Sequence, residues 1–224
     1  MNIGYNIIKD FKRVNKECID CFNSIPVPNI GDAMNRTAAI SSSIRPFNNK
    51  RLQGTAYTVR VQAGDNLLIY YAIDNAKPGD VIVVDGNGFI DRALLGGIMS
   101  TYAAKRGITG IVVDGAIRDP EDLAHLDINV FARAISPNGP YKNGPGEINV
   151  PVNIGGHIIN PGDILIGDHD GLVVINPNQA LEIAKKAQEV IKKEEKMMNL
   201  IDTECKMDLA WMYKKLENDG CEFK

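Results

Sequence analysis

An arginine and an aspartate, Arg118 and Asp119, stand next to each other directly after a segment whose pattern predicts a buried strand. The run from Ile111 to Val113 is apolar at successive positions, which is typical of a parallel strand covered on both faces. Charged residues just past such a strand lie at the carboxyl edge of the sheet, where α/β proteins bind ligands. Arg118 could hold a carboxylate through two parallel hydrogen bonds, and Asp119 offers a hard oxygen ligand for Mg²⁺ or Mn²⁺.

The same pair also has a purely structural interpretation. An arginine and an aspartate can form a surface ion pair that caps the following helix, and Pro120 suits the first position of that helix. The residue types alone leave the two interpretations equally open.

Two adjacent glycines, Gly96 and Gly97, lie in a segment with helical periodicity. Glycines at the opening of a helix expose backbone N–H groups, and such a terminus binds carboxylate or phosphate. Close helix packing, or a turn with positive φ, would equally require glycine at these positions. Two glycines by themselves are therefore weak support for an anion site.

The cysteines do not predict a metal or redox centre. Only Cys18 and Cys21 form a Cys-x-x-Cys pair, and a zinc site would need two more ligands at similar spacing. The pair falls inside an amphipathic segment, Tyr5 to Phe22, which predicts a helix that half-buries small residues. Reduced thiols are what a reducing compartment favours.

The composition narrows the class of protein. The chain has 224 residues and is 44% hydrophobic, enough for one sizeable core. Its 25 basic and 28 acidic residues give a net charge of -3, so no basic surface is expected to attract nucleic acid. The apolar runs are too short to span a bilayer, and the N-terminus lacks the apolar region of a secretion signal. We therefore expect a cytoplasmic protein with no membrane or nucleic-acid partner.

Strands and helices are expected to alternate along the chain. The predicted strands are Gly54–Val61, Val81–Val84, Ile111–Val113, Val130–Ala134 and Ile164–Ile166. The predicted helices are Tyr5–Phe22, Asn66–Ala76, Ala93–Lys105, Glu121–Leu126, Pro177–Met198 and Met207–Leu216. This order indicates one α/β domain over residues 1–176, with helices packed outside a mixed sheet. Residues 177–224 form a helical tail that we expect to pack on a neighbouring subunit.

A long loop is expected at Ser136–Glu147, which is rich in proline, glycine and asparagine. Regular structure is not expected there, and a long ordered loop in a compact domain is often functional.

Several blocks of the chain resemble the RraA-like family. They are Pro78–Val81, Gly96–Met99 with Arg106–Gly107, Val113–Asp119, Pro161–Asp163 and Gly167–Val174. The blocks fall within residues 30–175 and are specific in combination. The resemblance implies a layered β/β/α sandwich of the swivelling-domain type, followed by a helical tail.

The resemblance also implies a metal-dependent lyase of the class II pyruvate aldolase type. The family includes enzymes that cleave 4-hydroxy-4-methyl-2-oxoglutarate to form pyruvate and that also decarboxylate oxaloacetate. It includes a regulator of ribonuclease E as well, so a non-enzymatic protein that binds a ribonuclease is the alternative. The implied cofactor is Mg²⁺ or Mn²⁺, the implied ligand is a small 2-oxo acid, and the implied assembly is a homotrimer or homohexamer with sites between subunits.

On the substrate side, the resemblance implies that Arg118 binds the substrate carboxylate and is catalytic. The segment of Gly96, Gly97, Ile98 and Met99 is implied to bind the same group, chiefly through the backbone N–H groups near Ile98 and Met99.

On the metal side, the resemblance implies that Asp119 is the protein ligand and a catalytic residue. An acidic residue from the tail helix of a neighbouring subunit is implied to approach the waters of the metal. Glu194 or Glu195 is the candidate for this residue.

One position departs from the family pattern. The aldolases carry an aspartate where this chain has Gly97, and that aspartate orients a water on the metal. Its loss should impair aldol cleavage, which needs a base for the substrate hydroxyl, more than decarboxylation, which needs none. The alternative is that another carboxylate, such as Asp114, Glu194 or Glu195, substitutes for it.

Overall fold

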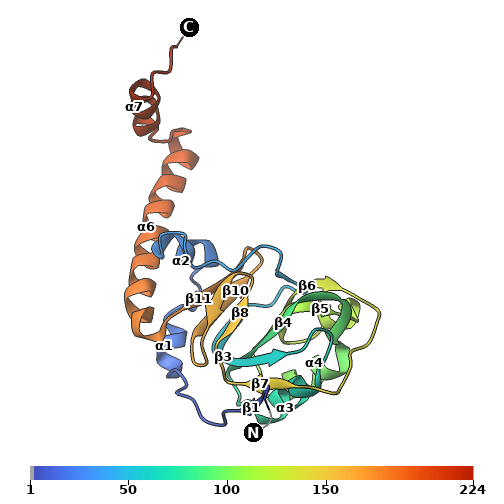
Figure 1. Cartoon of the computed structure of the whole chain (residues 1–224). Helices are drawn as coiled ribbons and strands as arrows, with labels where there is room; N and C mark the ends of the chain where they lie inside the picture. Colours follow the sequence, from blue (N-terminus) through green and yellow to red (C-terminus); the bar gives the residue numbers. More distant parts are fainter. Residues whose placement is uncertain (1–2, 224) are drawn as a thin grey trace.

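Parallel strands joined by helices form the middle of the molecule, as a computed structural model that describes residues 3–223 shows (Figure 1). The strands are β3 (Leu52–Val61), β4 (Asp80–Leu95), β5 (Gly110–Ile117) and β6 (Asn129–Ile135), each parallel to the next. The helices that connect them are α3 (Leu67–Asn75), α4 (Gly97–Lys105) and α5 (Pro120–Ala124). Every residue of β5 is buried, and this burial explains why its sequence contains an unbroken apolar run, as predicted.

Shorter strands extend this sheet on both sides. Along one edge, β3 pairs with β7 (Gly146–Ile148) and β10 (Ile164–Asp168), both antiparallel. β1 (Tyr5–Ile7) adds to β7, and β11 (Gly171–Ile175) adds to β10. β2 (Arg45–Pro46) closes the opposite edge against β6, and a separate hairpin consists of β8 (Val152–Ile154) and β9 (His157–Ile159). The sheet is therefore mixed.

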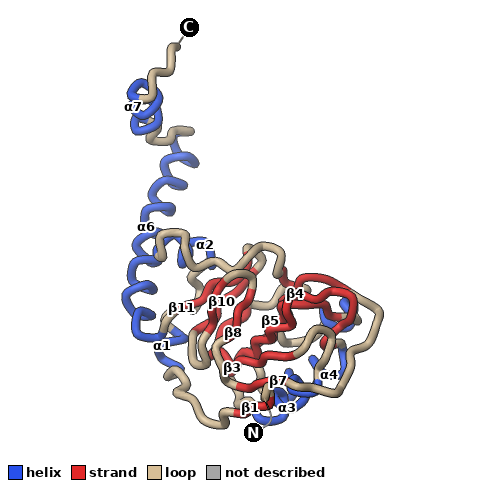
Figure 2. Tube along the Cα trace, viewed as in Figure 1, coloured by secondary structure: helices blue, strands red, loops and turns tan. Residues whose placement is uncertain are grey.

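The apolar core lies in layers on the two faces of the sheet. One cluster joins one face to α3 and α4, and includes Ile69, Ile82 and Leu95. A second joins the other face to the β8–β9 hairpin and β10, and includes Val83, Ile154 and Leu165. Strands gather between flanking helices in Figure 2. The architecture is the layered β/β/α type that the resemblance implied.

The N-terminal prediction was wrong, because no helix spans residues 5–22. The chain instead forms β1, runs without regular structure to residue 15, and makes only a short helix, α1 (Lys16–Asp20). Distant partners override the local helical pattern: β1 pairs with β7, and Arg13 donates two hydrogen bonds of 2.9 Å to the buried Asp80 carboxylate. A helix over this segment could make neither contact.

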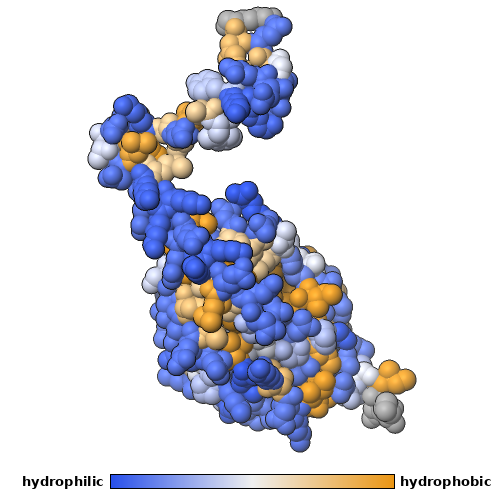
Figure 3. Space-filling view, turned by 90° about the vertical axis from the view of Figure 1, so that its left-hand side faces the viewer, coloured by the Kyte–Doolittle hydropathy of each residue, from blue (hydrophilic) through white to orange (hydrophobic). Residues whose placement is uncertain are grey.

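The C-terminal tail begins on its own domain and then leaves it (Figure 1). A 3₁₀ turn (Pro177–Gln179) leads into α6 (Ala180–Glu204), and α7 (Ala210–Asn218) follows. The first turns of α6 pack on α2 (Val27–Ala33) through buried Ala180, Ile183, Ala184 and Ala187. The remainder projects, and Figure 3 shows apolar surface on it between charged groups, with Trp211 67% exposed. No described helix combines the length and apolar character needed to cross a membrane.

The loop expected at Ser136–Glu147 is shorter than predicted, because Gly146 and Glu147 belong to β7. Residues 136–145 have no regular structure, as expected, yet they are firmly attached. The Asp65 carboxylate, buried just before α3, accepts hydrogen bonds from Asn143 N (2.6 Å) and Gly144 N (3.1 Å) through Oδ2. Its Oδ1 accepts from Leu67 N at 2.9 Å and so holds the start of α3. One buried side chain therefore fixes the loop to the helix beside it.

Asp65→Ala should lower the free energy of unfolding by about 3 kcal/mol, because buried N–H groups would lose a charged acceptor. Urea denaturation followed by circular dichroism measures this change. Asp208→Ala is the matched control, since the exposed Asp208 carboxylate also accepts from a backbone N–H two residues ahead, that of Ala210. The control should change stability by less than about 0.5 kcal/mol. Equal stabilities of the two variants would contradict the role given to Asp65.

Candidate functional site

The ends of β4 and β5 bring the predicted site residues together. β4 continues through irregular pairing to Leu95, so α4 begins at Gly97 and not at Ala93 as predicted. Leu95 pairs with Ile117, the last residue of β5, and the Arg118 N–H donates to the Leu95 carbonyl at 3.0 Å. The two strands therefore end side by side, at the carboxyl edge where the sequence predicted a site.

Asp119 turns back toward the start of α4. Its backbone is left-handed (φ 57°), and its Oδ2 accepts a 3.0 Å hydrogen bond from the Gly97 N–H. The same oxygen lies 3.6 Å from Arg118 Nε. Pro120 does begin α5, but the Asp119 side chain makes no hydrogen bond that caps this helix. The interpretation that Asp119 caps the following helix, α5, is thus wrong, because its carboxylate binds the start of α4 instead.

Close approach explains the first glycine. A Cβ at Gly96 would meet the Asp119 carboxylate and would lie 2.8 Å from Arg118 Cγ. Its φ of −152° is ordinary extended backbone, so positive φ is not the reason for glycine here. Without a side chain at this position, the Arg118–Asp119 pair can lie directly against the turn.

The second glycine faces a different carboxylate. A Cβ at Gly97 would lie 2.8 Å from Asp122 Oδ2 and 3.2 Å from Asp122 Cβ. An aspartate at position 97 would therefore require Asp122 to move, which the sequence pattern did not reveal. The N–H groups of Ile98 and Met99 precede the first bond into the helix, which Ser100 N donates to the Gly96 carbonyl at 3.1 Å. They lie at the positive end of α4, which suits a carboxylate.

A cavity of about 90 Å³ lies beside this turn. Arg118, Asp119, Gly96, Ile98 and Met99 line it, so most predicted site residues do meet. Its remaining wall comes from residues that the sequence analysis missed: Asn66, Tyr70, Ala93, Leu94, Leu95, Pro140 and Lys142.

Lys142 adds a second cation to the cavity. Its Nζ lies 5.4 Å from the centre of the Tyr70 ring, and the Asp65 hydrogen bonds to the next two residues hold its loop in place. Asn66 is 1% exposed and donates to the Leu94 carbonyl at 2.9 Å, while its Oδ1 has no partner among the described residues. In the sequence, the one feature that pointed to this wall of the cavity was the unusual length of the loop that carries Lys142.

The candidate metal ligands do not all meet within one chain. No group of three or more His, Cys, Asp or Glu side chains in residues 3–223 is arranged to hold a metal ion. Glu194 Oε2 accepts a 2.6 Å hydrogen bond from Asn29 Nδ2, and the neighbouring Glu195 is exposed. Both lie on α6, on the opposite side of the molecule from α4 (Figure 1). Within the described chain, only Asp119 of the predicted metal set borders the cavity.

Asp114 is engaged elsewhere. It is 5% exposed, pairs with Arg133, and accepts a 2.8 Å hydrogen bond from Gly155 N. These contacts tie β5 to β6 and to the turn between β8 and β9. Asp114 does not line the cavity, and its carboxylate is occupied by these contacts.

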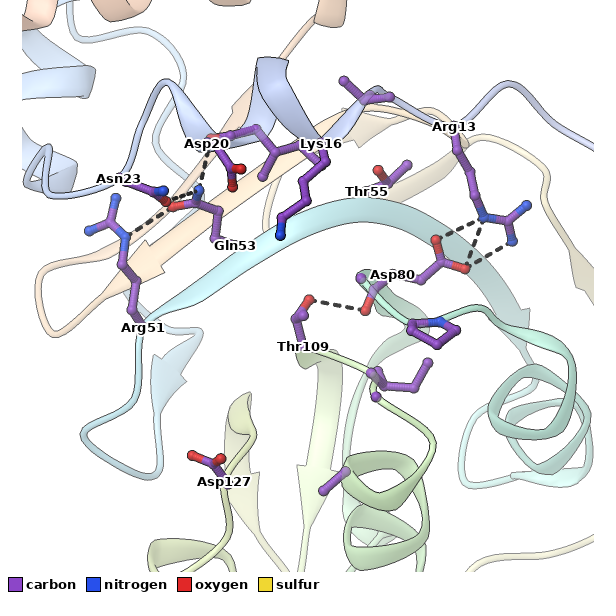
Figure 4. Close-up of a pocket in the computed structure, with 17 residues that line it drawn as sticks. Arg13, Lys16, Asp20, Asn23, Arg51, Gln53, Thr55, Asp80, Thr109 and Asp127 are labelled. Atoms are coloured by element: carbon purple, nitrogen blue, oxygen red, sulfur yellow. Dashed lines mark hydrogen bonds and ion pairs between the residues drawn. The ribbon is translucent and has the colours of Figure 1, made fainter.

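A larger cavity, of about 680 Å³, lies at the other end of the parallel strands (Figure 4). Three of its charged side chains are ion-paired: Arg13 with Asp80, and Asp127 with Lys50. Arg51 donates to the carbonyls of Phe22 and Ile25. Lys16 and Asp20 also line this cavity and form no ion pair with another described residue.

Cys18 and Cys21 are both half-buried, as predicted. Burial, and next the neighbouring Cys18, raise the pKa of the Cys21 thiol, and its Sγ donates to the Cys18 carbonyl at 2.9 Å. A raised pKa disfavours the thiolate that redox or metal chemistry needs.

A family model described as Aldolase/RraA, RraA-like, matches residues 27–174 of this chain. The chain belongs to the RraA-like family. The matched region runs from α2 to β11, and so contains both strand ends and the cavity between them.

Relatives in the RraA-like family carry two kinds of name. A candidate 4-hydroxy-4-methyl-2-oxoglutarate aldolase of Halalkalibacterium halodurans is 42% identical over 168 residues, which cover 75% of this chain and 80% of the relative. The 4-hydroxy-4-methyl-2-oxoglutarate aldolase of Thermus thermophilus is 38% identical over 125 residues, 56% of this chain and 76% of the relative. The structure of the RNA-processing inhibitor RraA from Thermus thermophilis superposes with a TM-score of 0.63 at 33% identity, covering 67% of this chain and 92% of that one.

Gly96→Ala should lower the free energy of unfolding by about 1–3 kcal/mol, because the added methyl group overpacks the turn against Arg118 and Asp119. Gly31→Ala is the matched control: a Cβ there meets nothing within 4 Å. Gly31 lies inside α2, so alanine should stabilise the protein by about 0.5–1 kcal/mol. Chemical denaturation of both variants measures the two changes. A Gly96→Ala protein as stable as the wild type would show that this turn is not tightly packed.

Proposed function

We propose that this protein is a divalent-metal-dependent carbon–carbon lyase that forms pyruvate from small 2-oxo acids. The substrates proposed are 4-hydroxy-4-methyl-2-oxoglutarate, by aldol cleavage, and oxaloacetate, by decarboxylation. The observation that carries the proposal is the adjacent Arg118 guanidinium and Asp119 carboxylate, placed at the open start of α4. The aldolase names of relatives at 42% and 38% identity support it.

The cationic side of the cavity suits a dicarboxylate. Arg118 is 44% exposed and can bind the carboxylate next to the 2-oxo group through two N–H donors. The N–H groups of Ile98 and Met99 can share the same carboxylate. Lys142, across the cavity, can bind a second carboxylate, which both proposed substrates carry.

Asp119 suits Mg²⁺ or Mn²⁺ better than zinc. Mg²⁺ keeps several waters and is commonly held by one or two carboxylates together with its substrate. Asp119 is 40% exposed, and only its Oδ2 is engaged by Gly97 and Arg118. When bound, the metal would supply the Lewis acid that withdraws charge from the 2-oxo group as the carbon–carbon bond breaks. Arg118 would hold the substrate so that this bond faces the metal.

A neighbouring subunit is proposed to complete the site. Ile98, at the mouth of the cavity, is 85% exposed, and the projecting half of α6 carries Glu195 in solvent. In a homotrimer or homohexamer the tail of one subunit would cover the cavity of the next, which would bring Glu194 or Glu195 near Asp119. For Glu194 this requires release of its hydrogen bond to Asn29.

The alternative function is a non-enzymatic regulator that binds a ribonuclease. The structural similarity to a protein named as an RNA-processing inhibitor supports this alternative. The lyase is favoured because inhibition by protein contact does not require an arginine–aspartate pair beside an open helix start.

Pyruvate formation from both substrates should depend on Mg²⁺ or Mn²⁺ and on Asp119. Asp119→Asn tolerates the left-handed backbone and keeps an acceptor for Gly97, so it should fold normally. It should nevertheless lower Mn²⁺ affinity by at least about 10-fold in calorimetry and abolish most turnover, because the charged metal ligand is lost. Asp74→Asn, an exposed change on α3, is the control. Unchanged Mn²⁺ affinity in Asp119→Asn would remove this residue from the metal site.

Arg118→Lys should lower kcat/KM by about tenfold or more, on the order of 1.4 kcal/mol of transition-state binding. Lysine keeps the charge but cannot form two parallel hydrogen bonds to one carboxylate. Steady-state kinetics with oxaloacetate measure the effect, and Arg106→Lys, which pairs with Asp74 on the surface, serves as the control. Wild-type kinetics in Arg118→Lys would exclude Arg118 from substrate binding.

A further inference from the structure

The loop that forms one wall of the cavity lies directly against the arginine proposed to bind the substrate carboxylate. Pro140 and Lys142 line the cavity from this loop. A Cβ on Gly139, the residue before them, would lie 3.5 Å from Arg118 Nη1. The position of Lys142 relative to Arg118 therefore depends on how firmly the loop is held near Gly139.

A second arginine, Arg92, attaches the loop at this point. Its Nη1 donates a 2.8 Å hydrogen bond to the Gly139 carbonyl, and its guanidinium carbon lies 4.1 Å from the centre of the Tyr141 ring. In this loop, the Asp65 carboxylate bonds only to the two residues that follow Lys142. Arg92 thus adds a separate attachment, at the part of the loop that lines the cavity.

The path of the Arg92 side chain explains a glycine just before α3. A Cβ on Gly64 would lie 3.1 Å from Arg92 Cδ, and the Gly64 backbone is left-handed, with a φ of 74°. The Gly64 carbonyl accepts a 2.7 Å hydrogen bond from the Tyr141 N–H. Glycine at this position therefore lets Arg92 and the loop approach the same turn together.

Arg92 is not committed to a structural ion pair. None of the ion pairs found among residues 3–223 includes it. Its side chain is half-buried and does not border the cavity itself. Any effect of Arg92 on a bound ligand must therefore act through the loop, by way of Gly139 beside Arg118 and of Lys142.

We propose that Arg92 is a positioning residue that makes the site selective for dicarboxylates. By fixing residues 139–142, it keeps the Lys142 ammonium across the cavity from the Arg118 guanidinium. A 2-oxo acid with two carboxylates then engages both cations, whereas a 2-oxo acid with one carboxylate engages only Arg118. The inference rests on the proposed function, and it names a residue outside the cavity that the Arg118–Asp119 pair does not imply.

The test compares a substrate that has two carboxylates with a ligand that has one. Arg92→Met keeps a flexible, unbranched side chain but removes the charge and the hydrogen-bond donors. It should raise the KM for oxaloacetate about tenfold and change the inhibition constant of pyruvate by less than about twofold, because only the group for the second carboxylate is misplaced. Arg92→Lys keeps a charge over the Tyr141 ring, so its KM should stay within about threefold of the wild type.

Arg45→Met is the matched control. The Arg45 guanidinium also lies over an aromatic ring, 5.9 Å from the centre of Phe47, but on β2 at an edge of the sheet. This variant should leave the KM for oxaloacetate and the inhibition by pyruvate unchanged. Thermal unfolding verifies that both methionine variants are folded.

A double variant identifies the group through which Arg92 acts. Lys142→Met should show the same selective rise in KM, and Arg92→Met combined with Lys142→Met should be no worse than either change alone, since both remove one interaction. Additive losses would overturn the proposal. So would equal effects of Arg92→Met on the KM for oxaloacetate and on inhibition by pyruvate.

Amide hydrogen exchange reports on the loop without any turnover. In Arg92→Met, exchange over residues 139–144 should be at least about tenfold faster than in Arg45→Met, because the loop opens more often. Unchanged exchange there would contradict the attachment by Arg92. A wild type that does not turn over oxaloacetate would instead refute the proposed function, and the exchange experiment would still decide whether Arg92 holds the loop.

Discussion

The hydrogen bond from the Gly97 N–H to the Asp119 carboxylate joins two strand-to-helix turns, and the site is organised around it. β4 and β5 end level with each other because Arg118 N bonds to the Leu95 carbonyl. To reach across, Asp119 adopts a left-handed backbone, which costs about 1–2 kcal/mol in a residue with a side chain. Gly96 must lack a Cβ so that the carboxylate can approach. A single contact thus dictates the residue types at both turns.

The same contact leaves opposite charges close together without neutralising them fully. Arg118 Nε is 3.6 Å from Asp119 Oδ2, a separation too long for a strong hydrogen bond, and both side chains remain two-fifths exposed. An anion beside Arg118 and a cation beside Asp119 can therefore bind at adjacent points. The proposed 2-oxo acid substrates carry a carboxylate and a carbonyl on neighbouring carbon atoms, and this spacing is the reason for proposing them.

The parts of the fold that could be predicted are those set by local sequence. Val81–Val84 and Ile111–Val113 lie in buried parallel strands, as their unbroken apolar runs predicted, and Arg118–Asp119 follows one of them. The start of α4 was misplaced because the apolar segment Ala93–Leu95 fits either a helix or a buried strand. The prediction of an N-terminal helix was wrong for another reason: the contacts that keep the backbone around Arg13 out of a helix come from a residue far away in the chain.

The residues that form the walls of the site could not be predicted from the sequence, for a related reason. Lys142 reaches the cavity only because Asp65, far earlier in the chain, holds its loop. The sequence analysis did not single out Asp122, because only the packing of α5 on α4 brings it to Gly97. Sequence patterns within a helix or strand indicate which side chains are buried, whereas contacts between loops depend on tertiary packing.

The shared space at positions 97 and 122 has an evolutionary consequence. Since a side chain at position 97 would begin where the Asp122 carboxylate now lies, the two positions are sterically coupled. A larger residue at position 97 is therefore expected to occur together with a smaller residue at position 122, or with a different orientation of Asp122.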